Sequence, residues 1–499
     1  MVCAMPNVNS YENLCAVDRD AAPLQHAASI LGWDQEVNMP AKGLAQRSAA
    51  LAGLAGEMHK RYCQPQIAEW LSDCESDPFP AGSVEAANVS LWREGYDRRT
   101  KFPGEFIEEK SRTSSEAKAA WAEARKKSDF SLFAPLLERQ VDIARREADY
   151  IGYVDQPYDA LIEKFERGMT TANLQGIFGS FRGELTQIAG EAVERAEANP
   201  PRAFEGEFSI EGQQMINREV AEWIGFDFEA GRIDTTTHPF CSGIALGDTR
   251  MTTRYYPQDF TASLYGVMHE SGHGLYNQGL PVEHFPHPVY DAVSLGIHES
   301  QSRLWENQIG RSLEFWNVWT ERAGEIFPQL AGWTPEEMTA AVNCAGYTFI
   351  RVDADEATYD LHIALRFEVE LMLLNREIEA ADVPRVWNEK FKAMFGLDVP
   401  EDSQGCLQDI HWSMGALGYF PTYTLGNLGA AQLMESAMAD TSVSAAFAGG
   451  DPHPLLDWMR PRVHRVGSSL TPSEIIEKAT GKPLAPDAFL RHLRKRFLG

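Results

Sequence analysis

The stretch GVMHESGHGLYNQGL (residues 266–280) contains His269 and His273 four positions apart, with Glu270 directly after the first histidine. Side chains four residues apart on an α-helix project from the same face, so both imidazoles can reach one metal ion. Glu270 then lies about 100° further round the helix, where it could take a proton from a metal-bound water. The stretch therefore predicts a metal site on a helix, with a coincidental match in an ordinary helix as the alternative.

A helix is predicted from Asp259, a typical N-cap residue, to Gly279, which suits the position after a helix end. One face of this helix is apolar and consists of Phe260, Leu264, Val267, Met268, Leu275 and Tyr276. Gly272 and Gly274 would each cost the helix about 1 kcal/mol relative to alanine. We therefore expect another segment of the chain, or a substrate, to approach the helix closely at these glycines.

A metal centre of this type needs a third protein ligand. The pattern His-Glu-x-x-His-x-x-Gly-x-x-His is excluded, because Tyr276 and Gly279 occupy its glycine and last histidine positions. The other common solution takes a glutamate from a second helix downstream. The sequence offers three candidates, which are Glu283, Glu299 and Glu306.

Glu299 is the candidate that the sequence favours. It lies in a predicted helix that Asp291 caps, 26 residues after His273, which leaves room for a turn and an antiparallel return. Glu283 lies in a proline-bounded loop, which is a poor support for a ligand. Glu306 lies two helical turns beyond Glu299 and is interpreted as a structural residue. A solvent-facing polar role for Glu299 and the histidine before it is the alternative.

The composition indicates a large globular protein without nucleic-acid or membrane partners. Of its 499 residues 44% are hydrophobic, and 45 Lys and Arg against 72 Asp and Glu give a net charge of −27. No run approaches the ~18 consecutive apolar residues of a membrane-spanning helix. The N-terminal segment lacks the pattern of a secretory signal, and the seven cysteines are scattered without a Cys-x-x-Cys pair. These features predict a cytoplasmic protein.

Helical periodicity dominates the chain, and proline- and glycine-rich breaks interrupt it at residues 77–84, 197–208 and 446–454. The strand-like segment GIALGDTRMTTRYY lies at residues 243–256, just before the motif helix. We expect a mainly α fold with a small β element, organised as one domain over residues 1–499. A division into subdomains 1–200 and 201–499 at the middle break is an option. Basic residues near the C-terminus, in LRKRFLG, are interpreted as a solvated or subunit-facing helix end.

Six short motifs follow one another along the chain, around and including the motif helix. They are THPF (237–240), DTRMT (248–252), HESGH (269–273), HESQ (298–301), IRVDAD (350–355) and GCLQDIHW (405–412). Together they resemble the carboxypeptidase Taq family of metallocarboxypeptidases, and the resemblance extends over nearly the whole chain. It implies a large helical metallopeptidase fold in which two halves flank a deep active-site groove with the metal at its floor. It also implies a homodimer.

The resemblance implies release of single amino acids from peptides with a free C-terminus, with broad tolerance of side chains. Its metal ligands fall on His269, His273 and Glu299, the residues that spacing also favours. Zn²⁺ suits two imidazoles and a carboxylate, so one Zn²⁺ per chain is expected, with Co²⁺ or Mn²⁺ as alternatives. Glu270 is then the general base that takes the proton of the attacking water.

Two arginines belong to the motifs that carry the resemblance. A guanidinium can bind the terminal carboxylate of a substrate with a bidentate fork. Arg351 is the first choice for this role and Arg250 is the second. Both could instead pair structurally with nearby acids, namely Asp248, Asp353 or Asp355.

The tetrahedral intermediate of peptide hydrolysis needs hydrogen-bond donors for its developing oxyanion. The resemblance assigns this role to Tyr423 together with His238 or His411, although a buried tyrosine or histidine more often has a purely structural role. Gln408 and Asp409 are expected to hydrogen-bond metal ligands or substrate.

Two other functions are alternatives. A helical endopeptidase or dipeptidyl carboxypeptidase shares the logic of this metal site, but the arginine-bearing motifs favour release of one residue at a time. A catalytically silent metal-binding scaffold would be expected to lack Glu270 or one of the ligands. All four residues are present, which favours an enzyme.

Overall fold

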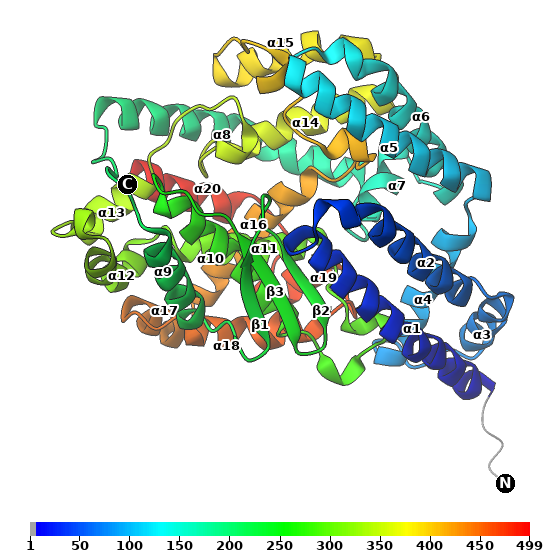
Figure 1. Ribbon diagram of the computed structural model, residues 1–499. Coiled ribbons are helices and arrows are strands. Elements are labelled where there is room, and N and C mark those ends of the chain that lie inside the picture. Colours follow the sequence, from blue (N-terminus) through cyan, green and yellow to red (C-terminus); the bar gives the residue numbers. More distant parts are fainter. Residues whose placement is uncertain (1–5) are drawn as a thin grey trace.

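Helices form most of the chain, as the periodicity predicts (Figure 1). The computed structural model describes residues 6–499. The helices before the sheet are α1 (Pro6–Val37), α2 (Leu44–Tyr62), α3 (Pro65–Ser76), α4 (Val84–Thr100), α5 (Gly104–Lys127), α6 (Ala134–Ile151), α7 (Pro157–Glu163), α8 (Thr171–Ala198) and α9 (Ile210–Trp223). The helices after the sheet are α10 (Phe260–Asn277), α11 (Leu295–Arg303), α12 (Leu313–Ile326), α13 (Pro335–Val342), α14 (Tyr359–Leu374), α15 (Val383–Phe395), α16 (Pro421–Met438), α17 (Thr441–Ala448), α18 (His453–Arg462), α19 (Pro472–Thr480) and α20 (Asp487–Leu493).

A small sheet precedes α10. Its strands are β1 (Gly231–Thr235), β2 (Cys241–Ala245) and β3 (Asp248–Thr253), in the order β1-β3-β2. The central strand β3 pairs in parallel with β1 and antiparallel with β2. The prediction of a small β element before the motif helix is confirmed, but the predicted segment 243–256 omits β1. The sequence of β1 contains only one large apolar residue, Ile233, so it lacks the alternation that marks a strand.

The hydrophobic core consists of three main clusters. The first combines α5–α8 with α14–α16 and α20, so that Leu137 and Phe181 pack in the same cluster as Phe367 and Leu425. The second surrounds α10 and includes residues of α9, α12 and α16–α19. The third is smaller and joins α1, α3 and α4. The first cluster contains residues from both sides of residue 200. The division into subdomains 1–200 and 201–499 stays a prediction.

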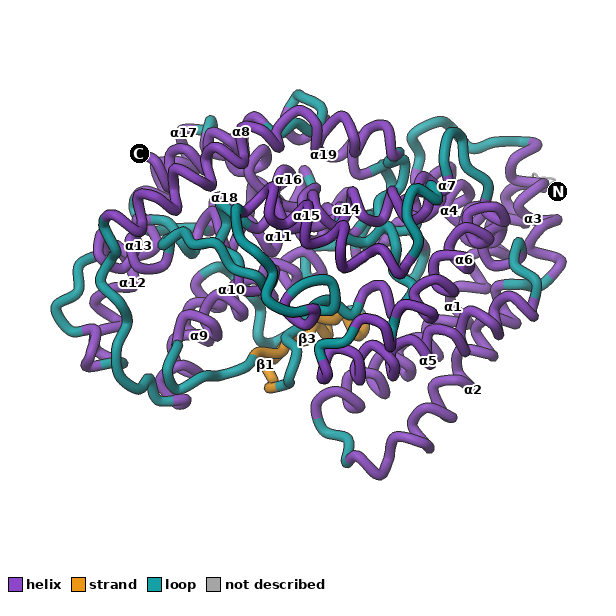
Figure 2. The backbone as a smooth tube through the Cα atoms, turned by 90° about the horizontal axis from the view of Figure 1, so that it is seen from above, coloured by secondary structure: helices purple, strands orange, loops and turns teal. Residues whose placement is uncertain are grey.

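The two helices that carry the candidate ligands lie at the centre of the fold. Helix α11 contacts both α10 and α16, which come from distant parts of the chain (Figure 2). Strand β3 packs on α10, and β2 contacts α1. Tertiary packing on several sides therefore fixes the orientation of α10 and α11.

Helix α11 begins later than predicted. Its N-cap is Ser294, whose side chain accepts the backbone N–H of Ile297 at 3.0 Å, rather than Asp291. The carboxylate of Glu166 also accepts the backbone N–H of Gly296 at 2.9 Å. Because Glu166 comes from the segment after α7, this second cap could not be read from the local sequence.

Helix α10 begins as predicted, with Asp259 accepting backbone N–H groups of the first turn. Gly279 follows its C-terminal end, and its φ angle is not in the left-handed region. An added Cβ at Gly279 would collide with the side chains of Arg460 and His464. Close packing, rather than a left-handed turn, therefore requires this glycine.

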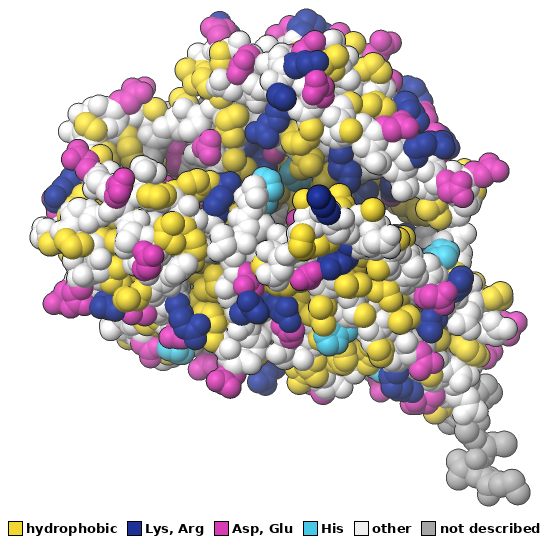
Figure 3. All heavy atoms as spheres, viewed as in Figure 1, with side chains coloured by type: hydrophobic (Ala, Val, Ile, Leu, Met, Phe, Trp, Pro, Cys, Tyr) yellow, Lys and Arg dark blue, Asp and Glu magenta, His cyan; other side chains and the backbone are white. Residues whose placement is uncertain are grey.

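The surface charge, the helices and the cysteines each bear on an expectation from the sequence. On the face shown in Figure 3, acidic and basic side chains are interspersed and no broad basic area is visible. Within residues 6–499, no helix combines the length and the apolar character needed to cross a membrane. The cysteines of this range are all free.

Candidate metal centre

His269 and His273 lie one turn apart on α10. Apolar residues on the other side of the helix, including Phe260, Leu264 and Val267, are completely buried and fix its rotation. The two imidazole rings are 4.9 Å apart between their centroids. The helix therefore presents both rings toward the same point, as the spacing predicts.

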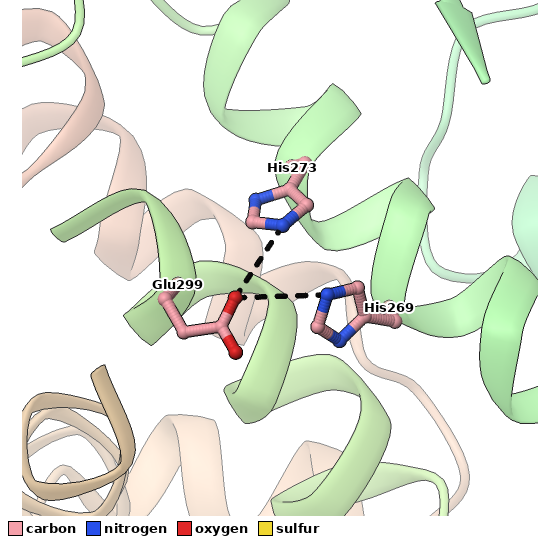
Figure 4. A group of neighbouring side chains, drawn as sticks. All are labelled: His269, His273 and Glu299. Atoms are coloured by element: carbon pink, nitrogen blue, oxygen red, sulfur yellow. Dashed lines mark ion pairs between the residues drawn. The ribbon is translucent and has the colours of Figure 1, made fainter. Parts of the chain in front are cut away.

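Glu299 reaches the two histidines from α11 (Figure 4). Its Oε2 atom lies 3.6 Å from Nε2 of His269 and 3.5 Å from Nε2 of His273. The three donor atoms all lie within 4.8 Å of one another. Tetrahedral ligands with bonds of about 2.0–2.2 Å to one ion lie roughly 3.4 Å apart, which is close to both measured distances. The three side chains therefore fit a single metal ion.

Nδ1 of each imidazole, called the outer nitrogen here, already has a hydrogen-bond partner. Nδ1 of His269 lies 2.8 Å from Oε2 of Glu306. Nδ1 of His273 lies 2.5 Å from Nδ1 of His298, whose Nε2 lies 3.3 Å from Oδ1 of Asn277. An amide oxygen only accepts, so His298 donates from Nε2 and accepts the proton of His273 at Nδ1. Both outer nitrogens therefore donate, which leaves Nε2 of each ring as the metal-binding atom.

The positive charge of Arg303 partly balances the negative charges of Glu299 and Glu306. Arg303 donates from Nε to Oε1 of Glu299 at 2.7 Å and from Nη1 to Oε2 of Glu306 at 3.2 Å. Burial lowers the pKa of His269, but the carboxylates of Glu299 and Glu306 outweigh burial and raise this pKa to about 9. Burial also opposes ionisation of Glu306, yet Arg303 and His269 hold the pKa of Glu306 well below its usual range. A metal ion must therefore displace a proton from His269 when it binds.

Glu299 is held by packing as well as by hydrogen bonds. The hydroxyl of Ser302 donates to Oε2 of Glu299 at 3.0 Å. On the other side, α16 packs so closely that a Cβ at Gly426 would lie 2.6 Å from Cβ of Glu299. Only glycine fits at this position of α16, and the Glu299 side chain has little freedom to turn.

Gly272 and Gly274 have different close neighbours. A Cβ at Gly272 would lie 2.5 Å from the backbone oxygen of Gln301 and 2.6 Å from Cα of Ser302. The expectation of a close approach is confirmed there, because α11 crosses α10 at Gly272. A Cβ at Gly274 would instead lie 2.5 Å from the ring of Phe226. For Gly274 the close neighbour is the buried ring of Phe226, before the sheet, so the expected approach of another segment is confirmed there too, although that segment is not α11.

Gly272→Ala is expected to weaken metal binding and lower stability. The added methyl group meets the backbone of α11, which cannot move without displacing Glu299, and such overpacking typically costs about 1–3 kcal/mol. Gly266→Ala on the same helix is the matched control, because its nearest neighbour, Oγ1 of Thr253, would lie at 3.6 Å. Thermal unfolding and metal titration of both variants test the prediction. Equal metal affinity in the two variants would contradict it.

Glu270 lies close enough to His269 and Glu299 for their charges to act on it. This residue is 6% exposed. Burial raises the pKa of Glu270 to about 7, while the charge of His269 opposes this shift and that of Glu299 adds to it. No group within residues 6–499 donates a hydrogen bond to this carboxylate. It is therefore free to accept a proton from a water molecule or substrate.

Glu306→Gln is expected to lower metal affinity about 10–100-fold, the loss typical of a residue that orients a metal ligand. Glutamine can still accept from Nδ1 of His269, but without the negative charge that strengthens this hydrogen bond. Glu321→Gln, at an exposed position of α12, is the control. Competition with a chromophoric chelator measures the affinity of each variant. Wild-type affinity in Glu306→Gln would show that this contact does not support the site.

Arg351, Tyr423 and His411 form a cluster beside the metal centre. Oη of Tyr423 lies 3.3 Å from Nε2 of His411, and the guanidinium carbon of Arg351 lies 4.9 Å from the centre of the Tyr423 ring. Tyr359 connects this cluster to the centre, because its hydroxyl accepts from Nη1 of Arg351 at 2.7 Å. The guanidinium of Arg303 lies 4.7 Å from the centre of the same Tyr359 ring. Three of the candidate residues are therefore brought together.

Arg351 is paired with an acid outside its own motif. Oδ1 of Asp409 accepts from Nε of Arg351 at 3.2 Å and from Nη2 at 2.7 Å, while its Oδ2 accepts from Nε of Arg366 at 2.7 Å. Oε1 of Gln408 accepts the backbone N–H of Arg351 at 2.7 Å. Gln408 and Asp409 thus position Arg351 rather than the metal ligands. Of the five N–H groups of a guanidinium, three have these acceptors or Tyr359, which leaves two for a substrate.

Arg250 and His238 lie on and beside the sheet. Arg250, in β3, donates from Nε and Nη2 to the two carboxylate oxygens of Asp248, each at 2.7 Å. This is one of the structural pairings that the sequence left open. His238 lies between β1 and β2 and is exposed. The described residues show no hydrogen bond or ion pair that joins either side chain to the three candidate ligands.

Sequence reasoning missed Arg303 and interpreted Glu306 as structural only. Both follow Glu299 at helical spacings of four and seven residues, a signal that could have placed them on the same face. Gly426 and Tyr359 come from distant segments and carry no comparable local signal.

The chain is similar to a known family and to solved structures. The family model described as carboxypeptidase Taq (M32) metallopeptidase matches residues 13–497. Thermostable carboxypeptidase 1 of Thermus thermophilus is 39% identical over 500 residues, which covers 98% of each chain. The crystal structure of an M32 carboxypeptidase from Deinococcus radiodurans has a TM-score of 0.94 at 36% identity and covers 98% of this chain and 99% of its own. The structure of Pyrococcus furiosus carboxypeptidase named Apo-Mg has the same TM-score at 35% identity, covering 98% and 99%.

A mainly helical fold in which a His-Glu-x-x-His helix meets a glutamate from the next helix defines the chain as a metallopeptidase. Such a fold is the one the sequence predicts. The chain belongs to the carboxypeptidase Taq (M32) family of metallopeptidases. It is therefore a peptide hydrolase, and the resemblance carried by the six motifs is confirmed.

Proposed function

We propose that this chain removes single amino acids from the C-termini of peptides, with broad tolerance of side chains. The observation that carries the proposal is the triangle of His269, His273 and Glu299, with Glu299 within 3.6 Å of both rings and the unpaired Glu270 carboxylate beside it. The relatives named carboxypeptidases support the choice of an exopeptidase.

The proposed cofactor is one Zn²⁺ per chain, with Co²⁺ or Mn²⁺ as alternatives. Two imidazoles and a carboxylate suit Zn²⁺, and three protein ligands leave a fourth position for water or substrate. Mg²⁺, which appears in the name of the Pyrococcus furiosus structure, prefers oxygen ligands in octahedral geometry. The imidazole pair of this chain therefore favours zinc. When bound, the ion polarises the scissile carbonyl and lowers the pKa of a water molecule.

Glu270 takes the proton of the attacking water and later delivers it to the leaving amine. Its burial and its lack of hydrogen-bond donors support this role. Tyr423 donates its hydroxyl to the developing oxyanion, with His411 as its partner at 3.3 Å. Burial lowers the pKa of His411 to about 4, so this ring is neutral near pH 7 and can exchange hydrogen bonds with the tyrosine. His238, exposed between β1 and β2, is the second proposed donor.

Arg351 binds the terminal carboxylate of the substrate in this proposal. Its guanidinium is oriented by Asp409 and Tyr359, retains two N–H groups, and lies in the cluster that contacts Arg303. Arg250 is the second choice. To bind a substrate carboxylate, Arg250 would have to leave Asp248 or share its N–H donors between Asp248 and the substrate.

The experiment that tests the function uses N-blocked tripeptides with either a free C-terminal carboxylate or a C-terminal amide. We expect mass spectrometry to show loss of one residue from the free acids and none from the amides. A chelator should stop the reaction, and added Zn²⁺ should restore it. Release of dipeptides, or cleavage of the amides, would contradict the proposal and indicate a dipeptidyl carboxypeptidase or an endopeptidase.

A homodimer is the proposed assembly, and it follows from the family resemblance. Sedimentation velocity tests it directly, because one chain has a mass of 55.7 kDa. A species of that mass at all concentrations would contradict the dimer.

A further inference from the structure

The basic C-terminal segment LRKRFLG contains an arginine that is not at the surface. Arg496 lies in the turn Arg494–Leu498 that follows α20, and its side chain is 10% exposed, against 43% for Arg494. The interpretation of this segment as solvated or subunit-facing is wrong for Arg496. Its counter-charge is the buried Glu356, whose Oε2 lies 3.4 Å from Nη1 of Arg496. Oε1 of Glu356 also lies 2.9 Å from Nε2 of His492, so an arginine and a histidine of the C-terminal segment contact the same acid.

A short π-helix, Leu304–Ile309, directly follows α11 and is called the π-turn below. Arg496 binds its backbone. In this turn the N–H of Gly310 bonds back to Trp305 at 3.0 Å, and the last carbonyl groups have no partner within the turn. Arg496 donates from Nη1 to the carbonyl of Asn307 and from Nη2 to the carbonyl of Gln308, the latter at 3.3 Å. One planar guanidinium therefore holds two successive carbonyls at the end of the turn.

The same turn carries Glu306, which accepts from Nδ1 of His269 at 2.8 Å. Arg311, just beyond the turn, lies 3.6 Å from Oε1 of Glu306 and donates from Nε to Oδ1 of Asn307 at 3.2 Å. The position of Glu306 thus depends on a turn whose backbone is held from outside by the C-terminal segment. A displacement of this turn would move the carboxylate that orients the first histidine.

We infer that Arg496 is a positioning residue for the metal centre, because it holds the π-turn and thereby keeps Glu306 against His269. This inference rests on the proposed metal ligands. The competing explanation is that Arg496 only anchors the C-terminus. Anchoring alone would affect the stability of the fold but not the geometry or affinity of the metal site.

The test compares Arg496→Met with Arg494→Met in the full-length protein loaded with Co²⁺. Methionine keeps much of the length of the side chain but removes its donors. We expect Arg496→Met to weaken Co²⁺ affinity at least about tenfold and to change the visible absorption bands of bound Co²⁺. Arg494→Met should change neither property, because Arg494 pairs with Glu184 at the surface. Unchanged affinity and bands in Arg496→Met, with only a lower unfolding temperature, would overturn the inference.

A double-mutant cycle with Glu306→Gln separates the two explanations further. If Arg496 acts through Glu306, Arg496→Met should cost less than about twofold in affinity when Glu306 is already replaced. A full additional tenfold loss would overturn the inference. If Arg496→Met does not fold, Arg496→Lys serves instead, because an ammonium keeps the charge but lacks the planar fork for both carbonyls. Wild-type affinity and bands in Arg496→Lys would then overturn the inference.

Failure of the proposed metal ligands gives a different result from failure of this inference. Co²⁺ binding that persists unchanged in His273→Ala would show that the ligands are wrong. Co²⁺ binding that is lost in His273→Ala but unaffected by Arg496→Met would leave the ligands intact and reject the role of Arg496.

Discussion

Glu270→Gln is expected to bind metal at the wild-type ratio and to hydrolyse peptides at least about 10³-fold more slowly, within the range typical of general-base catalysis. Glutamine keeps the shape of the side chain but cannot take the proton of the attacking water. Because no group of the described residues donates to the Glu270 carboxylate, the substitution breaks no hydrogen bond of the fold. Metal analysis and kcat, measured on the same preparation, test both parts of the prediction.

The matched control is Glu283→Gln, at an exposed position between α10 and α11. It should retain the wild-type kcat. Near-normal turnover in Glu270→Gln would reject this residue as the general base. Loss of metal from Glu270→Gln would show instead that Glu270 is needed to assemble the site.

Glu299→Gln is expected to reduce metal affinity by about 10³-fold or more, beyond the 10–100-fold loss typical of a residue that only orients a ligand. The substitution removes the one carboxylate of the donor triangle. It leaves Arg303 paired with Glu306, so the buried guanidinium keeps a counter-charge. Chelator competition gives the affinity, and activity at limiting metal should fall in parallel.

Glu306→Gln provides the decisive comparison for Glu299→Gln, because both replace an acid that contacts His269. The ligand assignment predicts the larger loss for Glu299→Gln. A larger loss for Glu306→Gln would make Glu306 the third ligand.

The helical class and the donor triangle could be predicted because their signals are local. A spacing of four residues fixes the relative direction of His269 and His273 on any helix. The candidate Glu299 followed from the requirement for a rigid support and from its distance along the chain. Asp259 was identified as a cap because an N-cap side chain bonds to backbone N–H groups only two or three residues further along the chain.

The remaining features depend on contacts between distant segments. Arg351 pairs with Asp409, 58 residues away, although acids of its own motif are closer in sequence. The fit of Gly426 against Glu299 arises from the packing of α16 on α11. The second cap of α11 comes from Glu166, far upstream, which accepts the backbone N–H of Gly296. Periodicity and spacing do not report such contacts.

Diffraction from crystals of the zinc-loaded protein, recorded at the zinc absorption edge, tests the metal centre most directly. We predict one anomalous peak per chain, within about 2.0–2.2 Å of Nε2 of His269, Nε2 of His273 and the carboxylate of Glu299. A peak bound by other residues, or no peak at these three side chains in fully loaded and active protein, would contradict the proposed site.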